Sequence, residues 1–319
     1  MFELASQWLT YSILGLARGT KLAGAAEFFF YDSFKIITLL FGMIFVIGVL
    51  RSYLSLAAVR GWTGGKNPLV SAAGAAVFGA ITPFCSCSSV PIFLSFIKAG
   101  IPLGTAFSFL ITSPLVNEYL VVLMAGVFGL KVAAAYAVTG MLTGMAAGLL
   151  IGRLKLDRFL ERGFSATGEP GADPVFKNFR ARMTFGCKEA TAITAKVWLW
   201  VLAGVAVGAA IHNYVPQDYI RTVMHAGGIF SVPLAVVLGV PMYGSCAAIM
   251  PIGAALFLKG VPLGTTLAFL MAVAGLSLPE AIILRRAIKL PLLAVFFGTV
   301  TLGITLCGYL FNAVAVYLM

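Results

Sequence analysis

The chain has 319 residues, of which 61% are hydrophobic and only 10% are charged. A soluble domain carries about 25% charged residues, so this composition excludes a water-soluble globular fold. The net charge of +11 comes from basic residues that gather in loops beside apolar runs. This is the positive-inside pattern of a membrane protein, and it argues against nucleic-acid binding.

The first segment of the chain, Met1–Leu16, carries Trp8 and Tyr11. Aromatic residues of this kind favour a helix that lies in the membrane interface, and a first membrane span is the alternative. Glu3 and the lack of a small-residue cleavage site argue against a signal peptide. We assign residues 1–23 to this N-terminal helix.

Four long apolar runs each hold about the 20 residues that span a hydrocarbon core. They are Ser33–Leu54, Leu130–Gly152, Ala192–His212 and Pro291–Leu318. Because they do not alternate in polarity, a transmembrane β-barrel is excluded. The fold class is therefore all-α, a polytopic integral membrane protein.

The segment Asn67–Gly100 contains two apolar stretches that are too short to cross the membrane. They are separated by Pro83 and the polar cluster C-S-C-S-S. Helical pieces of about 10–14 residues are candidates for re-entrant segments. We predict a hairpin that dips in from the cytoplasm, with its tip near mid-membrane. Two ordinary, tightly spaced spans are the alternative.

The chain repeats itself at an offset of 160 residues. PIFLSFIKAGIPLGTAFSFL, beginning at Pro91, and PIGAALFLKGVPLGTTLAFL, beginning at Pro251, are identical at nine of twenty positions. The matches include Gly and Pro, so shared apolar composition does not explain them. We predict two membrane repeats, 24–152 and 192–319, joined by the polar segment 153–191.

The polar segment is rich in Lys and Arg, so the positive-inside rule assigns it to the cytoplasm. The matched segments on its two sides must then cross in opposite directions, which defines an inverted-topology repeat. Inversion requires an odd number of crossings per half, and one re-entrant hairpin per half satisfies this. The second hairpin would be Gly227–Gly260, entering from outside with Ser245 and Cys246 at its tip.

The two tips are the predicted substrate site. Helices that begin near Ser86 and Ser245 would point their free N–H groups and positive dipole ends at the membrane centre, which favours an anion or an electron-rich group. The thiols of Cys85, Cys87 and Cys246 are soft ligands for Cu(I), Zn²⁺ or trivalent arsenic. The alternative is that these cysteines are small packing residues. No C-x-x-C pair or neighbouring His completes a structural zinc site.

Two acidic residues follow breaks in the crossing segments. Glu118 comes after Ser113-Pro114, which interrupts the helix, and an ionisable residue inside a span is a functional candidate by default. Glu118 is the best candidate for a proton-carrying or substrate-contacting acid. Glu280 occupies the similar region of the second half, where pairing near the interface is the alternative. The full set of candidate substrate-binding residues is Cys85, Ser86, Cys87, Ser88, Ser89, Asn117, Glu118, Ser245, Cys246 and Glu280.

Three motifs, T-P-F-C-S-C-S-S-V-P from Thr82, A-G-I-P-L-G from Ala99 and S-P-L-V-N-E from Ser113, resemble the predicted permease family that includes the bacterial organoarsenical efflux permeases. The resemblance covers nearly the whole chain. It implies a cytoplasmic-membrane transporter, with efflux of trivalent organoarsenicals in some members. Residues at the family's motif positions are Cys85, Ser86, Cys87, Ser88, Pro114, Asn117 and Glu118.

We therefore expect a secondary transporter of a small thiophilic or anionic solute rather than an enzyme. No G-x-x-x-x-G-K-[ST] motif is present, so transport would be secondary or depend on a separate protein. The expected partners are the solute and the lipid bilayer, with no cofactor and no metal, and self-association is left open. The alternative function is a membrane-embedded thiol redox protein, which would need a second thiol pair where the second tip offers Cys246 alone.

Overall fold

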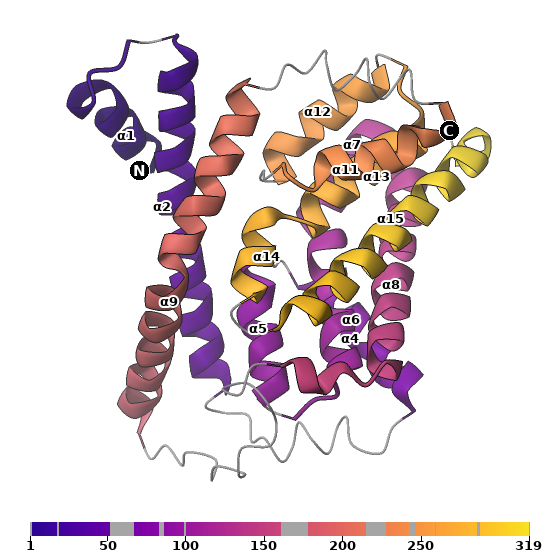
Figure 1. The fold of residues 1–319 in the computed structure, drawn as a ribbon, viewed down its shortest axis with the longest axis horizontal. Coiled ribbons are helices and arrows are strands. Elements are labelled where there is room, and N and C mark those ends of the chain that lie inside the picture. Colours follow the sequence, from indigo (N-terminus) through magenta and orange to yellow (C-terminus); the bar gives the residue numbers. More distant parts are fainter. Residues whose placement is uncertain are drawn as a thin grey trace.

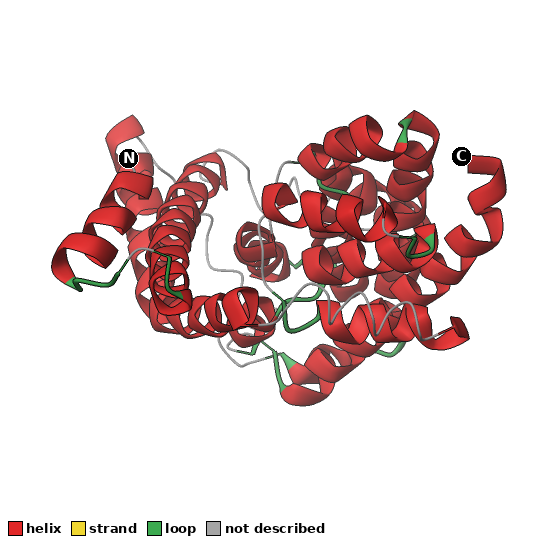
Figure 2. Ribbon diagram, turned by 90° about the horizontal axis from the view of Figure 1, so that it is seen from above, coloured by secondary structure: helices red, strands yellow, loops and turns green. Residues whose placement is uncertain are grey.

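The fold was obtained as a computed structural model, which describes residues 2–17, 19–51, 67–82, 86–98, 100–160, 178–214, 228–242, 246–258, 260–285 and 288–318. These residues form helices and no β-strand. Figure 2 shows the helices running in several directions, as in a bundle. The prediction of an all-α protein with several long apolar helices is confirmed.

Two long helices, α2 (Lys21–Arg51) and α9 (Phe179–Tyr214), pack against each other on one side of the molecule. They run in opposite directions (Figure 1). Gly186 allows their close approach, because a Cβ at this position would lie 2.7 Å from Val49 Cγ2 and 2.9 Å from the Phe45 carbonyl oxygen. The N-terminal segment, α1 (Phe2–Gln7) and the π-helix Trp8–Ile13, packs on α2.

The remaining helices form a second body. Its first half contains α4 (Pro68–Ile81), α5 (Ser86–Lys98), α6 (Leu103–Leu115), α7 (Glu118–Phe128) and α8 (Leu130–Arg153), and a short 3-10 turn, η2 (Leu156–Phe159), follows.

The second half contains η3 (Gly228–Phe230), α11 (Ser231–Gly239), α12 (Cys246–Leu258), α13 (Leu263–Gly275), α14 (Leu278–Leu284) and α15 (Leu290–Leu318). Its helix starts follow those of the first half at the offset of 160 residues, as at Ser86 and Cys246.

Three stretches of the described residues are long and apolar enough to cross a membrane: Leu130–Arg153, Leu263–Ile282 and Leu290–Leu318. The helices α6 and α7 pass the same test together but are bent by 42° at the break between them. The predicted runs Leu130–Gly152 and Pro291–Leu318 are confirmed as α8 and α15.

The other two predicted runs fall in α2 and α9, apart from residues 52–54, which lie outside the described part of the chain. Neither helix is among the candidate spans found over the described residues, so their role as spans stays a prediction.

The polar segment 153–191 is more helical than a simple connector. Helix α9 begins at Phe179, so the last part of the segment already belongs to a helix. Good helix formers such as Ala181, Arg182 and Lys188 supply the local preference, and packing on α2 supplies the tertiary one. Residues 161–177 lie outside the described ranges.

The body is held together by buried aromatic rings and by glycines. The Phe93 and Phe107 rings lie 4.8 Å apart, and Phe107 also contacts Phe296 of the other half at 5.6 Å. At Gly148 of α8, a Cβ would lie 2.6 Å from the Gly104 carbonyl oxygen of α6. Small residues that let helix backbones approach are the usual packing device in membranes, where lipid supplies no hydrophobic drive.

Candidate substrate site

Both predicted tips fall at breaks between short helices. α4 ends at Ile81, and Thr82 Oγ1 donates hydrogen bonds to the carbonyl oxygens of Phe78 at 2.9 Å and Gly79 at 3.1 Å. These bonds satisfy carbonyl groups that the end of a helix leaves open. The next helix begins at Ser86, as predicted. In the second half, the helix begins at Cys246, one residue after the predicted start near Ser245.

The predicted tip residues are only partly described. Cys85 and Ser245 lie outside the described residues. The side chains of Ser86, Cys87, Ser88 and Cys246 are likewise not described, although their backbones belong to α5 and α12. Ser89 is fully buried. A role for these residues in binding a solute therefore stays a prediction.

The crossing helices are broken at matching positions, and each break is capped by a side chain. Asn117 accepts a hydrogen bond from the Tyr119 backbone N–H at 3.0 Å, and Ser277 accepts one from the Glu280 backbone N–H at 3.3 Å. Asn117 and Ser277 are 160 residues apart and both are buried. They are N-caps of α7 and α14, which satisfy amide groups that would otherwise be costly in a membrane.

Sequence reasoning missed Ser277 as a functional position, although a signal was present. S-L-P-E, from Ser277 to Glu280, has the spacing S-x-x-E of a capping box, with proline near the start of the helix. The prediction that Ser113-Pro114 interrupts the first crossing helix is corrected in detail. Pro114 lies inside α6, which continues to Leu115, because a proline ring removes a hydrogen bond without ending the helix at its own position.

The two acidic candidates differ sharply in burial. Glu118 is the first residue of α7 and is exposed. Glu280 lies in the first turn of α14 and has an exposed fraction of 0%. The interface position considered for Glu280 is therefore not what burial indicates. α14 is covered by α5 and α9, elements that lie far from it in the sequence.

Helices from the two halves contact one another in a paired way. The tip helix α5 contacts α14, and its counterpart α12 contacts α7, where the Phe128 and Phe257 rings lie 5.2 Å apart. Matched helices also contact each other, α6 with α13 and α8 with α15. A Cβ at Gly303 would lie 2.5 Å from Thr143 Cγ2, its counterpart at the offset of 160. Each tip helix therefore lies beside the broken helix of the other half.

Within the described ranges, no group of three or more His, Cys, Asp or Glu residues is arranged to hold a metal ion. The geometry available here offers capped helix breaks, helix starts and one buried carboxyl group. These groups can bind a polar solute and move a proton.

Broken helices packed in this way, beside long apolar ones, define the class of a polytopic helical membrane protein. The model of the predicted permease family matches residues 21–313, so the chain belongs to that family.

Two relatives are similar over most of their length. The UPF0718 protein MJ0584 of Methanocaldococcus jannaschii is 23% identical over 335 residues, which cover 86% of this chain and 91% of that protein. The UPF0718 protein YcgR of Bacillus subtilis is 22% identical over 228 residues, which cover 70% of this chain and 75% of that protein. No solved structure matches.

Proposed function

We propose that this permease is a secondary transporter of the cytoplasmic membrane, and that its small solute binds at mid-depth between two re-entrant tips. The observation that carries the proposal is the paired contact of α5 with α14 and of α12 with α7. It brings the start of each tip helix toward a capped break from the other half. Transporters commonly build their substrate sites from discontinuous helices at the interface of two repeats.

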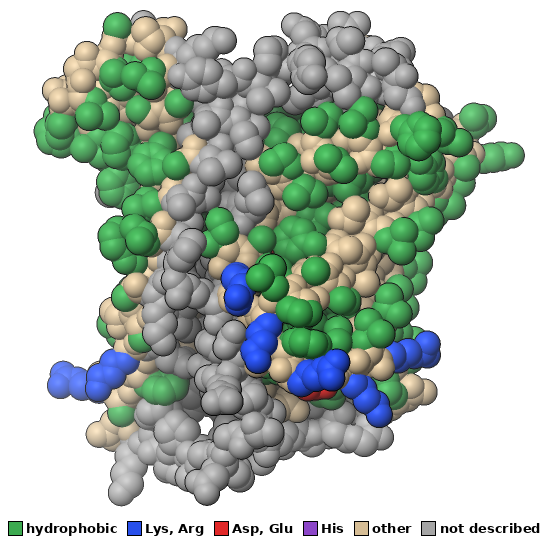
Figure 3. Space-filling view, in the orientation of Figure 1, with side chains coloured by type: hydrophobic (Ala, Val, Ile, Leu, Met, Phe, Trp, Pro, Cys, Tyr) green, Lys and Arg blue, Asp and Glu red, His purple; other side chains and the backbone are tan. Residues whose placement is uncertain are grey.

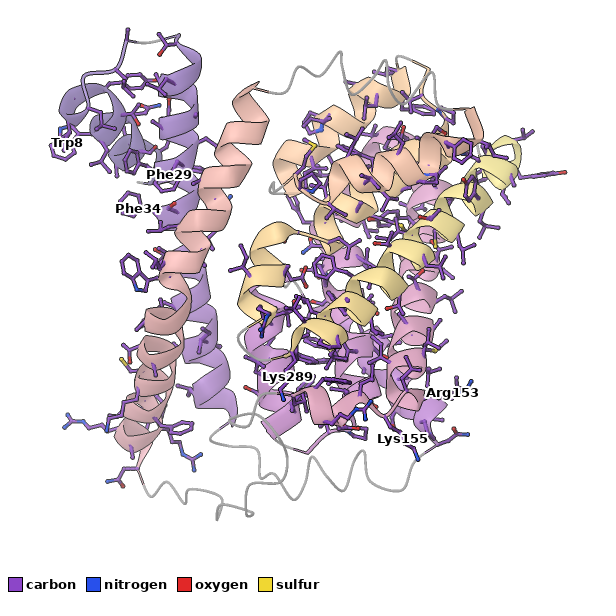
Figure 4. All side chains as sticks on the ribbon, viewed as in Figure 1. Trp8, Phe29, Phe34, Arg153, Lys155 and Lys289 are labelled. Carbon is purple, nitrogen blue, oxygen red and sulfur yellow. The ribbon has the colours of Figure 1, made fainter. Side chains whose placement is uncertain are left out.

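Inverted topology is the first element of the proposal. Its support is the opposite direction of matched helices: α8 ends at Arg153, and α15 begins beside Lys289 at the same end of the molecule (Figure 4). Contacts between matched residues, such as Thr143 with Gly303, are also expected close to a twofold axis that relates two halves. The basic end is the cytoplasmic one by the positive-inside rule.

Re-entrant hairpins are the second element. α4 has 14 residues, and α5 and α12 have 13 each. At 1.5 Å per residue such helices reach only about 20 Å, whereas the hydrocarbon core is about 30 Å thick. Short helices that turn back at Thr82 are therefore better explained by re-entry than by two complete spans.

The solute is the third element. Helix starts at Ser86 and Cys246 favour an anionic or electron-rich group, and thiols at Cys85, Cys87 and Cys246 favour a soft centre. Trivalent organoarsenicals, which combine a soft centre with small size, are the first class to test, and efflux is the direction to test first.

Coupling to protons is the fourth element, and burial changes the order of the two acids. A carboxyl group that is fully buried in a membrane protein is costly to ionise, so a proton on Glu280 would be bound and released with the state of the site. Glu118 is exposed and follows as the second candidate.

The experiment is a flux assay in proteoliposomes with methylarsenite, thiosulfate and phosphate as alternative solutes. Cys85→Ser and Cys87→Ser keep side-chain size and remove the soft ligand, so methylarsenite flux should be lost while the protein still folds. Cys187→Ser is the matched control, because Cys187 is an exposed residue of α9. Wild-type methylarsenite flux in both tip variants would contradict a thiol site. Loss of transmembrane thiol exchange without any solute flux in the wild type would favour the redox alternative.

A further inference from the structure

Basic side chains gather at one end of the body, where Figure 3 shows blue groups along the lower edge. We define the basic patch as Arg153, Lys155, Arg158 and Lys289, all of which are exposed. Asp157 is the one acidic residue in segments 153–160 and 288–290. The patch therefore carries a clear excess of positive charge.

The patch is assembled by the fold, because its parts are far apart in the sequence. The backbone N–H of Lys289 donates to the Phe159 carbonyl oxygen at 2.8 Å, and Leu160 forms an antiparallel bridge with Ile288. Leu160 and Ile288 are both buried. This backbone connection fixes the turn after α8 against the start of α15, so the basic residues of both segments share one surface.

Apolar side chains stand directly beside the cations. Leu154, between Arg153 and Lys155, is 49% exposed, and Leu290, next to Lys289, is 62% exposed. Exposed leucines beside exposed cations are unfavourable in bulk water but suit the headgroup level of a bilayer. There the apolar groups meet acyl chains, and the charged groups meet phosphates.

One cation of the patch is also held in place. The Arg158 guanidinium carbon lies 4.9 Å from the centroid of the Phe159 ring. Such a cation–π contact restrains the long side chain and reduces the entropy that binding would cost. Phe159 is the same residue whose carbonyl oxygen joins this turn to Lys289.

We infer that the basic patch binds the phosphate headgroup of an anionic phospholipid in the adjacent leaflet. The positive charge favours a lipid with net negative charge over a zwitterionic one, and the flanking leucines favour a lipid over a free anion. This inference does not rest on the proposed transport site. It requires only that the end of the body with Arg153 and Lys289 lies at a bilayer surface.

The test is a titration of the full-length protein in neutral detergent with phosphatidylglycerol and with phosphatidylcholine. Native mass spectrometry gives the dissociation constant of the first bound lipid. We expect wild-type protein to prefer phosphatidylglycerol. Each basic residue near an anionic surface contributes a factor of about five, so Arg158→Gln/Lys289→Gln should weaken phosphatidylglycerol binding by about 25-fold. Binding of phosphatidylcholine should not change.

The matched control is Arg180→Gln/Lys188→Gln, which removes two exposed charges from α9 at the same end of the molecule. It should keep the preference for phosphatidylglycerol. If Arg158→Gln/Lys289→Gln does not fold, Arg153→Gln/Lys155→Gln carries the same test and leaves the backbone bridge intact.

Three results would overturn the inference. The first is equal affinity of the wild type for both lipids. The second is an equal loss in the α9 control, which would mean a general effect of charge. The third is displacement of phosphatidylglycerol by excess inorganic phosphate, which would mean a site for free anions.

Discussion

Leu115 and Gly275 are 160 residues apart and lie against each other where α6 meets α13. A Cβ at Gly275 would lie 2.7 Å from Leu115 Cδ2 and 3.1 Å from its Cγ. These are matched positions of the two halves, one large and one without a side chain. The contact therefore joins the halves through a large-to-small pair that a strictly symmetric sequence could not make.

This contact can be tested with a double-mutant cycle. Gly275→Ala should lower the free energy of unfolding in mixed micelles by about 1–3 kcal/mol, because the added methyl group overpacks a buried site. In a Leu115→Ala background the same substitution should cost at least about 0.5 kcal/mol less, because the clash is removed. Additive effects in the double variant would show that the two residues do not touch.

The interface between α6 and α8 should be more sensitive still. At Gly148, a Cβ would meet backbone atoms, the Gly104 oxygen at 2.6 Å and the Ser108 nitrogen at 2.7 Å, and backbone cannot move aside as a side chain can. We expect Gly148→Ala to lower the unfolding midpoint clearly. At Gly298 of α15 no atom lies within 4 Å of the added Cβ, so Gly298→Ala is the control and should be neutral or slightly stabilising. Equal effects at the two glycines would contradict the close packing.

The two caps give a third prediction. Asn117→Ala and Ser277→Ala should each cost about 1 kcal/mol of stability, the typical value for a lost N-cap. Asn117→Asp should retain most of the stability, since a carboxylate oxygen can accept the same hydrogen bond. The measurement is thermal unfolding in detergent. Full stability of both alanine variants would mean that the caps do not stabilise the breaks.

Much of the local structure could be predicted from the sequence because Gly, Pro and Asn act locally. Asn67 caps α4 by accepting a hydrogen bond from the Leu69 backbone N–H at 3.2 Å, and Pro68 follows it at the start of the helix. The same logic located the start of α5 at Ser86. Such signals depend on a few neighbouring residues, and they hold whatever the rest of the chain does.

What could not be predicted depends on contacts between distant elements. The burial of Glu280 comes from packing of α14 beside α5 and α9, and nothing in the residues around Glu280 encodes it. The early start of α9 at Phe179 similarly reflects its packing on α2, which outweighs the polar composition of segment 153–191. The residues at the tips stay predictions, because their side chains lie outside the described part of the chain.

The fourth prediction separates the two acids. Glu280→Gln keeps the shape of the side chain but cannot ionise, so it should abolish gradient-driven transport while solute exchange is retained. Glu118→Gln, at an exposed position, should have a smaller effect. The measurement compares flux driven by a pH gradient with counterflow in the same proteoliposomes. Normal gradient-driven transport by Glu280→Gln would exclude this carboxyl group as the proton carrier.

The central claim is that each half contains a hairpin that enters and leaves the membrane on one side, and that the two hairpins enter from opposite sides. Single cysteines in a cysteine-free background, labelled from either side of sealed vesicles with an impermeant maleimide, test it most directly. Cysteines at Asn67, Gly100 and Asn178 should react only from the cytoplasmic side, and cysteines at Gly228 and Gly260 only from the outer side. Labelling of the Asn67 and Gly100 positions from opposite sides would mean two complete spans in the first half and would contradict the account.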